Sequence, residues 1–368
     1  MKKVQNFFSV IRYALACTGI CVGVLFVAAP FSCKLTEEGI EIVSVDKTVP
    51  QILSFDFKQR STLEIVCSEP VTLKEVQFKK ADDSGGTAYE VTVSYNETKT
   101  AAEIALSAPT EIGVQYDLTG VAEDLNGNSL TFSLPFTGYN DNPPVLVFSE
   151  IRSEGTAKTP EFVELYVLKS GNTAGLQITG GYDGKEKSYS FPMTEVQKGE
   201  YITVHFRHDS DTPDSCIDET GSDLALAAAD SKNNNCNTAR DLWAANADNS
   251  ARIQKTDVLV LTSDNGNTIL DAVLFSDGTK TEWQKALSKE LAAKAVAKGI
   301  WQSAAITDAA SNAGATTTRT LCRQNIAALA EATYESGAII PTSAADWFVV
   351  KTSGDTPGKQ NSSEKYTE

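Results

Sequence analysis

The stretch Tyr89-Glu-Val-Thr-Val-Ser-Tyr95 alternates apolar or aromatic residues with polar residues at every step. Because successive side chains of a β-strand point to opposite faces, this stretch predicts a strand with one apolar face. Residues 114–118 and 130–136 repeat the alternation, and the turn-forming stretch Asp124-Leu-Asn-Gly-Asn128 separates them. Several strands with one-sided burial predict an antiparallel β-sandwich over residues 48–140.

Three further stretches of this region resemble a known module. They are Val49-Pro50, Cys67-Ser-Glu-Pro-Val71 and the run from Tyr116 to Asn128. Their order is similar to that of a bacterial immunoglobulin-like module found in surface-layer and other envelope proteins. The resemblance implies an immunoglobulin-like sandwich that serves as a spacer or an adhesive surface.

Gly138-Tyr-Asn-Asp-Asn-Pro-Pro144 marks a boundary between two domains. Its two prolines resist helix and sheet pairing, while its glycine and asparagines favour turns. A second β-rich domain is predicted at residues 145–361, in which residues 162–167 alternate like those of the first domain. The polar residues 362–368 are predicted to form a disordered tail.

Six separated segments of the second half share their order and chemistry with one family. They are Phe148-Ser-Glu-Ile151, Glu161-Phe-Val-Glu-Leu-Tyr166, Asp257-Val-Leu-Val-Leu261, Asp271-Ala-Val-Leu-Phe275, Ser343-Ala-Ala-Asp-Trp347 and Asp355-Thr-Pro-Gly-Lys-Gln-Asn361. Together they resemble the lamin-tail domain, a small immunoglobulin-like β-sandwich found in nuclear lamins and in many exported bacterial proteins. The resemblance implies an architecture and no reaction. We interpret each segment as a strand, a turn or a core aromatic, with Trp347 in the core and Pro357-Gly358 in a turn.

Two insertions depart from the compact lamin-tail family. Residues 209–250 are acidic and predict a surface loop, in which residues 223–230 could form a short helix. Residues 281–315 begin with apolar residues at four-residue spacing, which predicts a helix. Its apolar positions are Trp283, Leu287 and Leu291, with Ala295 as a further candidate.

The predicted fold is therefore mainly β. It consists of two immunoglobulin-like antiparallel β-sandwiches in tandem, the second with a helical insertion, after an N-terminal signal helix and a linker at residues 34–47.

The first 33 residues predict an export segment. Lys2, Lys3 and Arg12 form a basic start, and residues 14–31 carry no charge. The apolar run ends at Ser32-Cys33, and this resembles a bacterial lipoprotein signal in which Cys33 is lipidated and becomes the mature N-terminus. Pro30 and Phe31 depart from the usual motif. The alternatives are the earlier Cys17 or Cys21, or an uncleaved anchor helix, because 18 apolar residues just span a bilayer.

The remaining cysteines divide into two groups. Cys216 and Cys236 bracket a polar segment of 19 residues, and a disulfide between them is predicted, worth roughly 3 kcal/mol in the chain-entropy model. Cys67 and Cys322 lie among apolar residues and are predicted to be small buried core residues.

The charge of the chain argues against nucleic acid as a partner. It has 48 acidic and 32 basic residues, giving a net charge of −16. Binding to phosphates depends on Lys and Arg that displace counterions, so an acidic chain is repelled by a duplex. The partners expected instead are the membrane, through the lipid anchor, and an envelope or host protein.

Candidate catalytic residues are few. His208, Asp209 and Asp211 could form a metal cluster, but they also fit an exposed strand end that runs into an acidic loop, and we favour the latter. Glu161 and Glu164 lie three apart on one predicted strand and are expected to act as edge charge or to accept a hydrogen bond from a neighbouring turn. The sequence has no Gly-x-Ser-x-Gly, no CxxC and no Gly-rich phosphate loop, so neither a catalytic residue nor a cofactor is predicted.

Two classes of function follow. The first is a membrane-anchored envelope or surface lipoprotein that acts as a non-enzymatic binding or structural module. The alternative is an accessory component of a secreted metal-dependent hydrolase, which rests on analogy with other chains that carry lamin-tail domains.

Overall fold

The computed structural model describes residues 32–36, 39–43, 47–81, 88–156, 159–180, 188–206, 216–225, 238–244, 253–263 and 268–367. Strands dominate this part of the chain, and they build two sandwiches with separate hydrophobic cores. The predicted mainly β class is confirmed. A short hairpin of β1 (Ser32–Thr36) and β2 (Gly39–Val43) precedes the first sandwich. The predicted signal helix lies outside the described residues, and within them no helix is long and apolar enough to cross a membrane.

The first domain contains a four-stranded sheet packed on a three-stranded sheet. The orders are β3-β4-β7-β6 and β5-β8-β9, and the strand pairs are antiparallel. The strands are β3 (Ile52–Gln59), β4 (Thr62–Cys67), β5 (Thr72–Lys80), β6 (Val91–Tyr95), β7 (Ala101–Leu106), β8 (Gln115–Glu123) and β9 (Ser129–Thr137).

Aromatic rings fill the space between these two sheets. The ring centroids of Phe57 and Phe136 lie 5.3 Å apart, and Phe78 stacks on Tyr116 at 5.0 Å. The predicted alternation is confirmed, because Tyr116 and Leu118 are buried and Val114 is partly buried against the same core. Cys67 is buried in the same core, as predicted.

The turn between β8 and β9 is held by the side chain of Asp124. Its Oδ1 accepts hydrogen bonds from the backbone N–H groups of Asn126 and Asn128, both at 2.8 Å. Gly127 has a φ of +85°, which glycine adopts without steric cost. The turn predicted from Asp124 to Asn128 is thus confirmed, and hydrogen bonds lock its conformation.

The second domain packs a six-stranded sheet against a five-stranded sheet. The orders are β17-β16-β11-β10-β21-β22 and β14-β13-β18-β19-β20. The strands of the first are β10 (Val145–Arg152), β11 (Phe162–Lys169), β16 (Tyr201–His205), β17 (Arg240–Trp243), β21 (Leu321–Arg323) and β22 (Trp347–Val349). Those of the second are β13 (Gln177–Gly180), β14 (Ser188–Ser190), β18 (Asp257–Ser263), β19 (Thr268–Ser276) and β20 (Ala310–Ser311). A two-stranded sheet pairs β12 (Gly171–Asn172) with β15 (Glu195–Val196).

Helix α2 (Ala286–Ala297) packs on β18 and β19 of the five-stranded sheet. Its buried residues include Leu291, Ala292 and Ala295, which lie on one side of the helix. The predicted helix is confirmed, although it begins at Ala286 and leaves Trp283 in the preceding turn. The remaining helical turns are α3 (Ile326–Ala330), η3 (Ile306–Asp308) and η4 (Ala344–Asp346).

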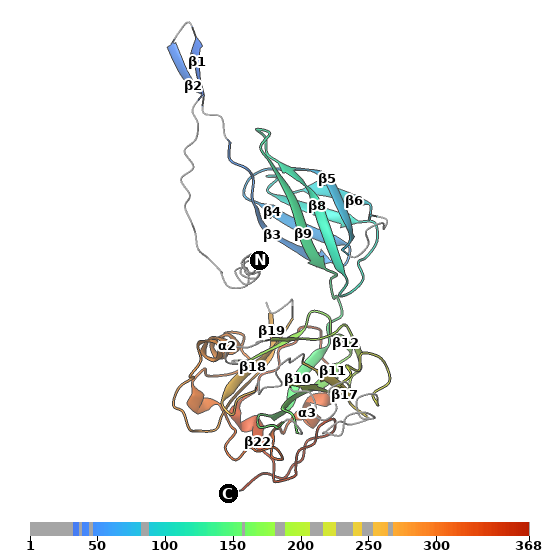
Figure 1. Cartoon of the computed structure of the whole chain (residues 1–368), viewed down its shortest axis with the longest axis vertical. Coiled ribbons are helices and arrows are strands. Elements are labelled where there is room, and N and C mark those ends of the chain that lie inside the picture. Colours follow the sequence, from blue (N-terminus) through green and yellow to red (C-terminus); the bar gives the residue numbers. More distant parts are fainter. Residues whose placement is uncertain are drawn as a thin grey trace, which may run out of the picture.

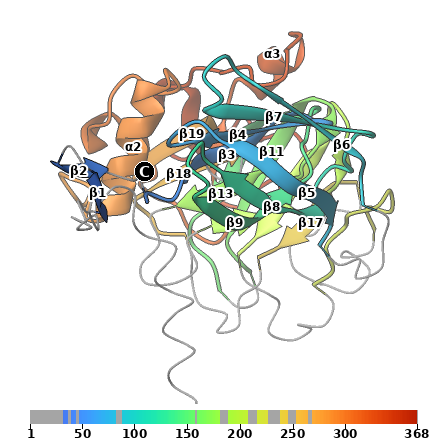
Figure 2. The ribbon, with the colours of Figure 1, turned by 90° about the horizontal axis from the view of Figure 1, so that it is seen from above.

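The two sandwiches are stacked along the long axis of the molecule (Figure 1). Viewed along that axis, strands of the first sandwich overlie strands of the second (Figure 2). The side chain of Asn140, in the linker, donates hydrogen bonds to the carbonyl oxygens of Asn172 and Ala174 at 2.6 and 3.0 Å. The segment predicted as a boundary therefore also joins the two domains.

The prediction of a disordered tail is wrong for residues 362–367. Val350 and Lys365 form an antiparallel bridge, and the backbone N–H of Tyr366 donates to the carbonyl of Val349 at 2.8 Å. The guanidinium of Arg319 lies over the ring of Tyr366, 4.0 Å from its centroid. The polar composition of the tail hid this outcome, because the order comes from backbone pairing with the edge of the sheet.

Candidate functional site

The outer face of the six-stranded sheet carries a row of buried polar side chains. The row crosses five strands in register and consists of Cys322, Glu150, Glu164, Thr203 and Asp241. Each of these side chains is at most 1% exposed. Such burial of charged side chains is unusual and requires hydrogen-bonding partners.

The C-terminal segment, residues 351–361, provides those partners for the two glutamates. Glu150 accepts hydrogen bonds from the Thr356 hydroxyl at 2.9 Å, from the Thr356 backbone N–H at 3.1 Å and from the Thr320 hydroxyl at 2.5 Å. Glu164 accepts one from the backbone N–H of Gly358 at 2.5 Å. The segment therefore seals this face of the sheet.

Glu150 and Glu164 are directly opposite each other on antiparallel strands. Like charges in this position repel, and burial makes ionisation costly. Burial raises the pKa of Glu150, and the hydrogen bonds from Thr320 and Thr356 together with the charge of Arg152 oppose this rise. Hydrogen bonds within the protein therefore hold both carboxyl groups in place.

A second row next to the first contains Arg152. Its guanidinium pairs with the carboxylate of Asp355 in the C-terminal segment and lies 4.7 Å from the ring centroid of Phe162. Cys322 lies opposite Glu150 on the neighbouring strand, and burial followed by the negative charge of Glu150 raises the pKa of its thiol. Cys322 is therefore a protonated core residue, as predicted, and not a nucleophile.

Asp271 forms a buried polar centre at the edge of the core. One of its carboxylate oxygens accepts from the backbone N–H of Phe148 at 2.7 Å and from the Arg323 guanidinium at 3.4 Å. Close by, the Asn361 amide donates to the carbonyl oxygens of Ser149 and Arg323, both at 3.0 Å. Residues that are far apart in the sequence thus meet here.

His205 and Asp241 form a buried pair on the same sheet. Nε2 of His205 lies 2.6 Å from Oδ1 of Asp241, and the His205 ring stacks on Trp243 with centroids 4.2 Å apart. The backbone N–H of Asp241 donates to the Glu219 carboxylate at 2.7 Å. Both side chains are at most 1% exposed, so the pair is not open to solvent.

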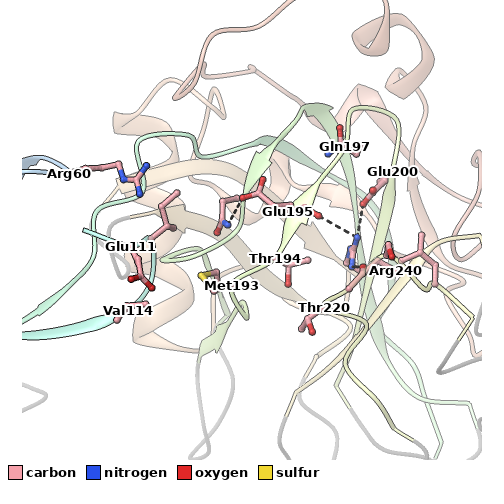
Figure 3. Close-up of a pocket in the computed structure, with 15 residues that line it drawn as sticks. Arg60, Glu111, Val114, Met193, Thr194, Glu195, Gln197, Glu200, Thr220 and Arg240 are labelled. Atoms are coloured by element: carbon pink, nitrogen blue, oxygen red, sulfur yellow. Dashed lines mark hydrogen bonds and ion pairs between the residues drawn. The ribbon is translucent and has the colours of Figure 1, made fainter. Parts of the chain in front are cut away.

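A pocket of about 750 Å³ lies between the two domains (Figure 3). Arg60 and Glu111 form its wall on the first domain, and Met193, Glu200 and Arg240 contribute from the second (Figure 3). Other residues in its wall are Ile112, Val114, Asn172, Thr194, Glu195, Gln197, Thr220, Gly221, Ser222 and Leu224.

The two arginines of the pocket have structural partners. Arg60 donates from Nε and Nη2 to the carbonyl of Thr110 at 3.0 and 2.7 Å. Arg240 is 3% exposed and donates to the carbonyl of Gly221 at 2.9 Å and to the Glu200 carboxylate at 3.3 Å. The lining of the pocket is mainly apolar, and it includes the exposed thioether of Met193.

The chemistry available to the described residues is therefore limited. No group of three His, Cys, Asp or Glu side chains among them is arranged to hold a metal ion. Glu150, Glu164 and Asp271 are absent from the walls of the interdomain pocket and of three smaller pockets in the described part of the chain.

A family model described as the TP_1001 protein second domain matches residues 144–349. This match covers more than half of the chain. The chain belongs to the TP_1001 second-domain family.

A relative from Treponema pallidum (strain Nichols) is described as an uncharacterized protein. It is 30% identical over 276 residues, which cover 75% of this chain and 64% of the relative. The chain thus spans less than two thirds of the length of the curated relative that it matches.

Two solved structures share weak likeness with this TP_1001 second-domain protein. A DUF4876 family protein from Bacteroides thetaiotaomicron VPI-5482 is 13% identical, with 78% of this chain and 90% of that chain covered and a TM-score of 0.26. The N-terminal part of the bacterial S-layer protein SbsC is 14% identical, with 62% of this chain and 43% of that chain covered and a TM-score of 0.24. At these TM-scores neither structure carries an argument about this protein.

Several predicted site residues lie outside the described residues. These are Cys236 of the predicted disulfide and the metal candidates His208, Asp209 and Asp211. Cys216 is half-buried, and its disulfide with Cys236 stays a prediction. Cys33 lies on β1, and its lipidation also stays a prediction. The short helix considered at residues 223–230 is not formed over residues 223–225, and its remainder is not described.

The expectation of edge charge at Glu161 and Glu164 is wrong, because both side chains are buried. The second expectation, a hydrogen bond from a neighbouring turn, is confirmed for Glu164 by Gly358. Trp347 is a core residue and Gly358 lies in a turn with a φ of +76°, as predicted. Sequence reasoning missed that residues 351–361 cover the sheet, although a glutamate inside an apolar strand is a signal of buried hydrogen bonding.

The pH dependence of the unfolding free energy tests the burial of the Asp271 side chain. Burial raises its pKa to about 6, with Arg323 and the Phe148 N–H acting in the opposite direction. The folded state therefore binds the Asp271 proton more tightly than the unfolded state does. Protonated Asp271 contributes to stability at acidic pH, and this contribution is lost as the pH rises from about 4 to about 6. We expect the unfolding free energy of the wild type, relative to that of Asp271→Asn, to fall by up to about 3 kcal/mol over this range, measured by urea titration at several pH values. A difference that does not change with pH would contradict the assignment.

Asn361 provides a test of the sealing segment. The Asn361→Ala substitution removes its donations to Ser149 and Arg323, and we expect a loss of about 1–3 kcal/mol in urea unfolding because two buried carbonyl oxygens lose their donor. We also expect faster proteolysis near the C-terminus. The control is Ser363→Ala, at an exposed position. Equal stability of both variants would show that the segment is not held by Asn361.

Proposed function

We propose that this TP_1001 second-domain protein is an exported envelope or surface lipoprotein, attached to the membrane by lipid at Cys33. Its two sandwiches act as a non-enzymatic binding or structural module, and the second is a lamin-tail-like domain. The observation that supports this proposal is the burial of Glu150 and Glu164 under residues 351–361. Both glutamates lie in segments that resemble the lamin-tail domain.

The burial matters because a catalytic carboxylate has to reach its substrate. Glu150 accepts hydrogen bonds from Thr320 and Thr356, and Glu164 accepts one from Gly358. Their role is to attach the end of the chain to the sheet. This leaves the surfaces of the two sandwiches, including the pocket between them, to contact a partner.

The anchor is supported by the sequence. A basic start, an uncharged stretch at residues 14–31 and Ser32-Cys33 follow one another in the order of a lipoprotein signal. An acylated cysteine with more than one chain would hold the two sandwiches at a membrane surface.

The anchor is tested by mass spectrometry of the N-terminal peptide from the membrane fraction. We expect a lipid-modified terminus at Cys33, and loss of this modification in Cys33→Ser. The matched control is Cys21→Ser, which changes a cysteine inside the apolar run and should leave the modification intact. An unmodified terminus at Met1 would show an uncleaved anchor helix and contradict lipidation.

The binding role is tested by recovery of partners from envelope extract with residues 34–368 as bait. We expect a specific protein that is lost with Met193→Asp, because Met193 is exposed in the wall of the interdomain pocket. Lys99→Ala, at an exposed turn in the first domain, should retain it. Metal-dependent hydrolysis without a recovered partner would favour the accessory role in a hydrolase.

A further inference from the structure

The first domain exposes several large apolar side chains. The described residues include five exposed large hydrophobic side chains, and four of them belong to this domain. The most exposed is Leu125 at 82%, followed on this domain by Leu53 at 62% and Val49 at 44%. One exposed leucine is ordinary on a protein surface, so the position of the group is what matters.

Strand direction places these three residues at one end of the domain. β8 and β9 pair from Gln115↔Thr137 to Glu123↔Ser129, and Thr137 leads directly into the linker. The turn with Leu125 therefore lies at the end away from the second domain, as Figure 1 shows for the β8–β9 hairpin.

β3 also runs between the two ends of the first domain. Arg60 follows the strand and lies in the wall of the interdomain pocket, so β3 ends next to the second domain. The strand starts at Ile52, and this places Val49 and Leu53 toward the opposite end. Val49, Leu53 and Leu125 thus share the end at which the chain from Cys33 reaches the domain.

The Leu125 side chain is presented by a fixed turn. Asp124 binds the backbone N–H groups of Asn126 and Asn128, and Oδ2 of Asp124 accepts from the Asn128 side chain at 2.7 Å. The turn is held without any contribution from Leu125, whose 82% exposure excludes a role in the core. A polar residue would serve the turn equally well.

The position of the anchor identifies what covers this end. Residues 34–46 lie between Cys33 and Lys47, and an extended chain of this length reaches at most about 45 Å. The β1–β2 hairpin folds part of it back and shortens the reach. With a net charge of −16 the protein gains nothing from anionic headgroups, so contact with a membrane would depend on apolar side chains.

We propose that the end of the first domain formed by Val49, Leu53 and Leu125 rests on the bilayer, with Leu125 inserted at the level of the headgroups. The occupant of this surface is the membrane that holds the lipid at Cys33. The inference rests on the proposed lipid anchor and adds an orientation, in which the second domain is held away from the membrane.

Tryptophan fluorescence of the full-length lipidated protein in phosphatidylcholine vesicles tests this orientation. The four native tryptophans all lie in the second domain, so Leu125→Trp adds the first such probe to the first domain. With brominated acyl chains in the vesicles, we expect the emission added by this substitution to shift to shorter wavelength and to be largely quenched. The matched control is Met193→Trp, an exposed apolar position in the second domain, whose added emission should not be quenched.

The outcomes separate the two proposals. Lipid on Cys33 by mass spectrometry together with unquenched emission from Leu125→Trp would overturn the orientation and leave the anchor intact. An unmodified N-terminus would overturn both. We expect quenching to persist in high salt, because the contact is apolar, and its loss in high salt would also overturn the proposal.

Discussion

Two carboxylates that face each other inside the second domain, Glu150 and Glu164, make the end of the chain a necessary part of its fold. Burying them without donors would cost several kcal/mol each, and residues 351–361 supply donors from about 200 positions further along the chain. The outer face of the six-stranded sheet therefore includes the C-terminal segment as one of its parts. This dependence gives a physical reason why the segment with Asp355, Thr356 and Gly358 occurs together with the strand segments that resemble the lamin-tail domain.

The same constraint decides where function can reside. Because the charged residues on this sheet are buried within the protein, the candidate surfaces are those that the fold leaves open. The interdomain pocket with Met193 is one, and the end of the first domain with Leu125 is another. The two surfaces lie at different levels along the molecule, so a membrane at one end and a partner between the domains do not compete for the same residues.

Local patterns were sufficient for much of the architecture. Alternation predicted β6, β8 and β9, and four-residue spacing predicted α2, because burial on one face imposes a period on the sequence. The turn from Asp124 to Asn128 followed from its own side-chain hydrogen bonds. The same reasoning failed at Glu164, because strand alternation does not show whether a second layer covers the polar face of a sheet. It also failed at residues 362–367, because composition does not show backbone pairing at a sheet edge.

The sequence by itself determined the mainly β class, the position of the linker and the order of strands and turns, since these depend on periodicity and on conformational preferences of nearby residues. Only the tertiary structure decided that Glu150, Glu164 and Asp271 are buried. It also decided that Thr356 and Gly358 donate to the two glutamates, and that Asn361 donates to neighbouring carbonyl oxygens. The physical reason is distance along the chain. A buried charge is stable only beside its donors, and here those donors come from a segment about 200 residues further along the chain.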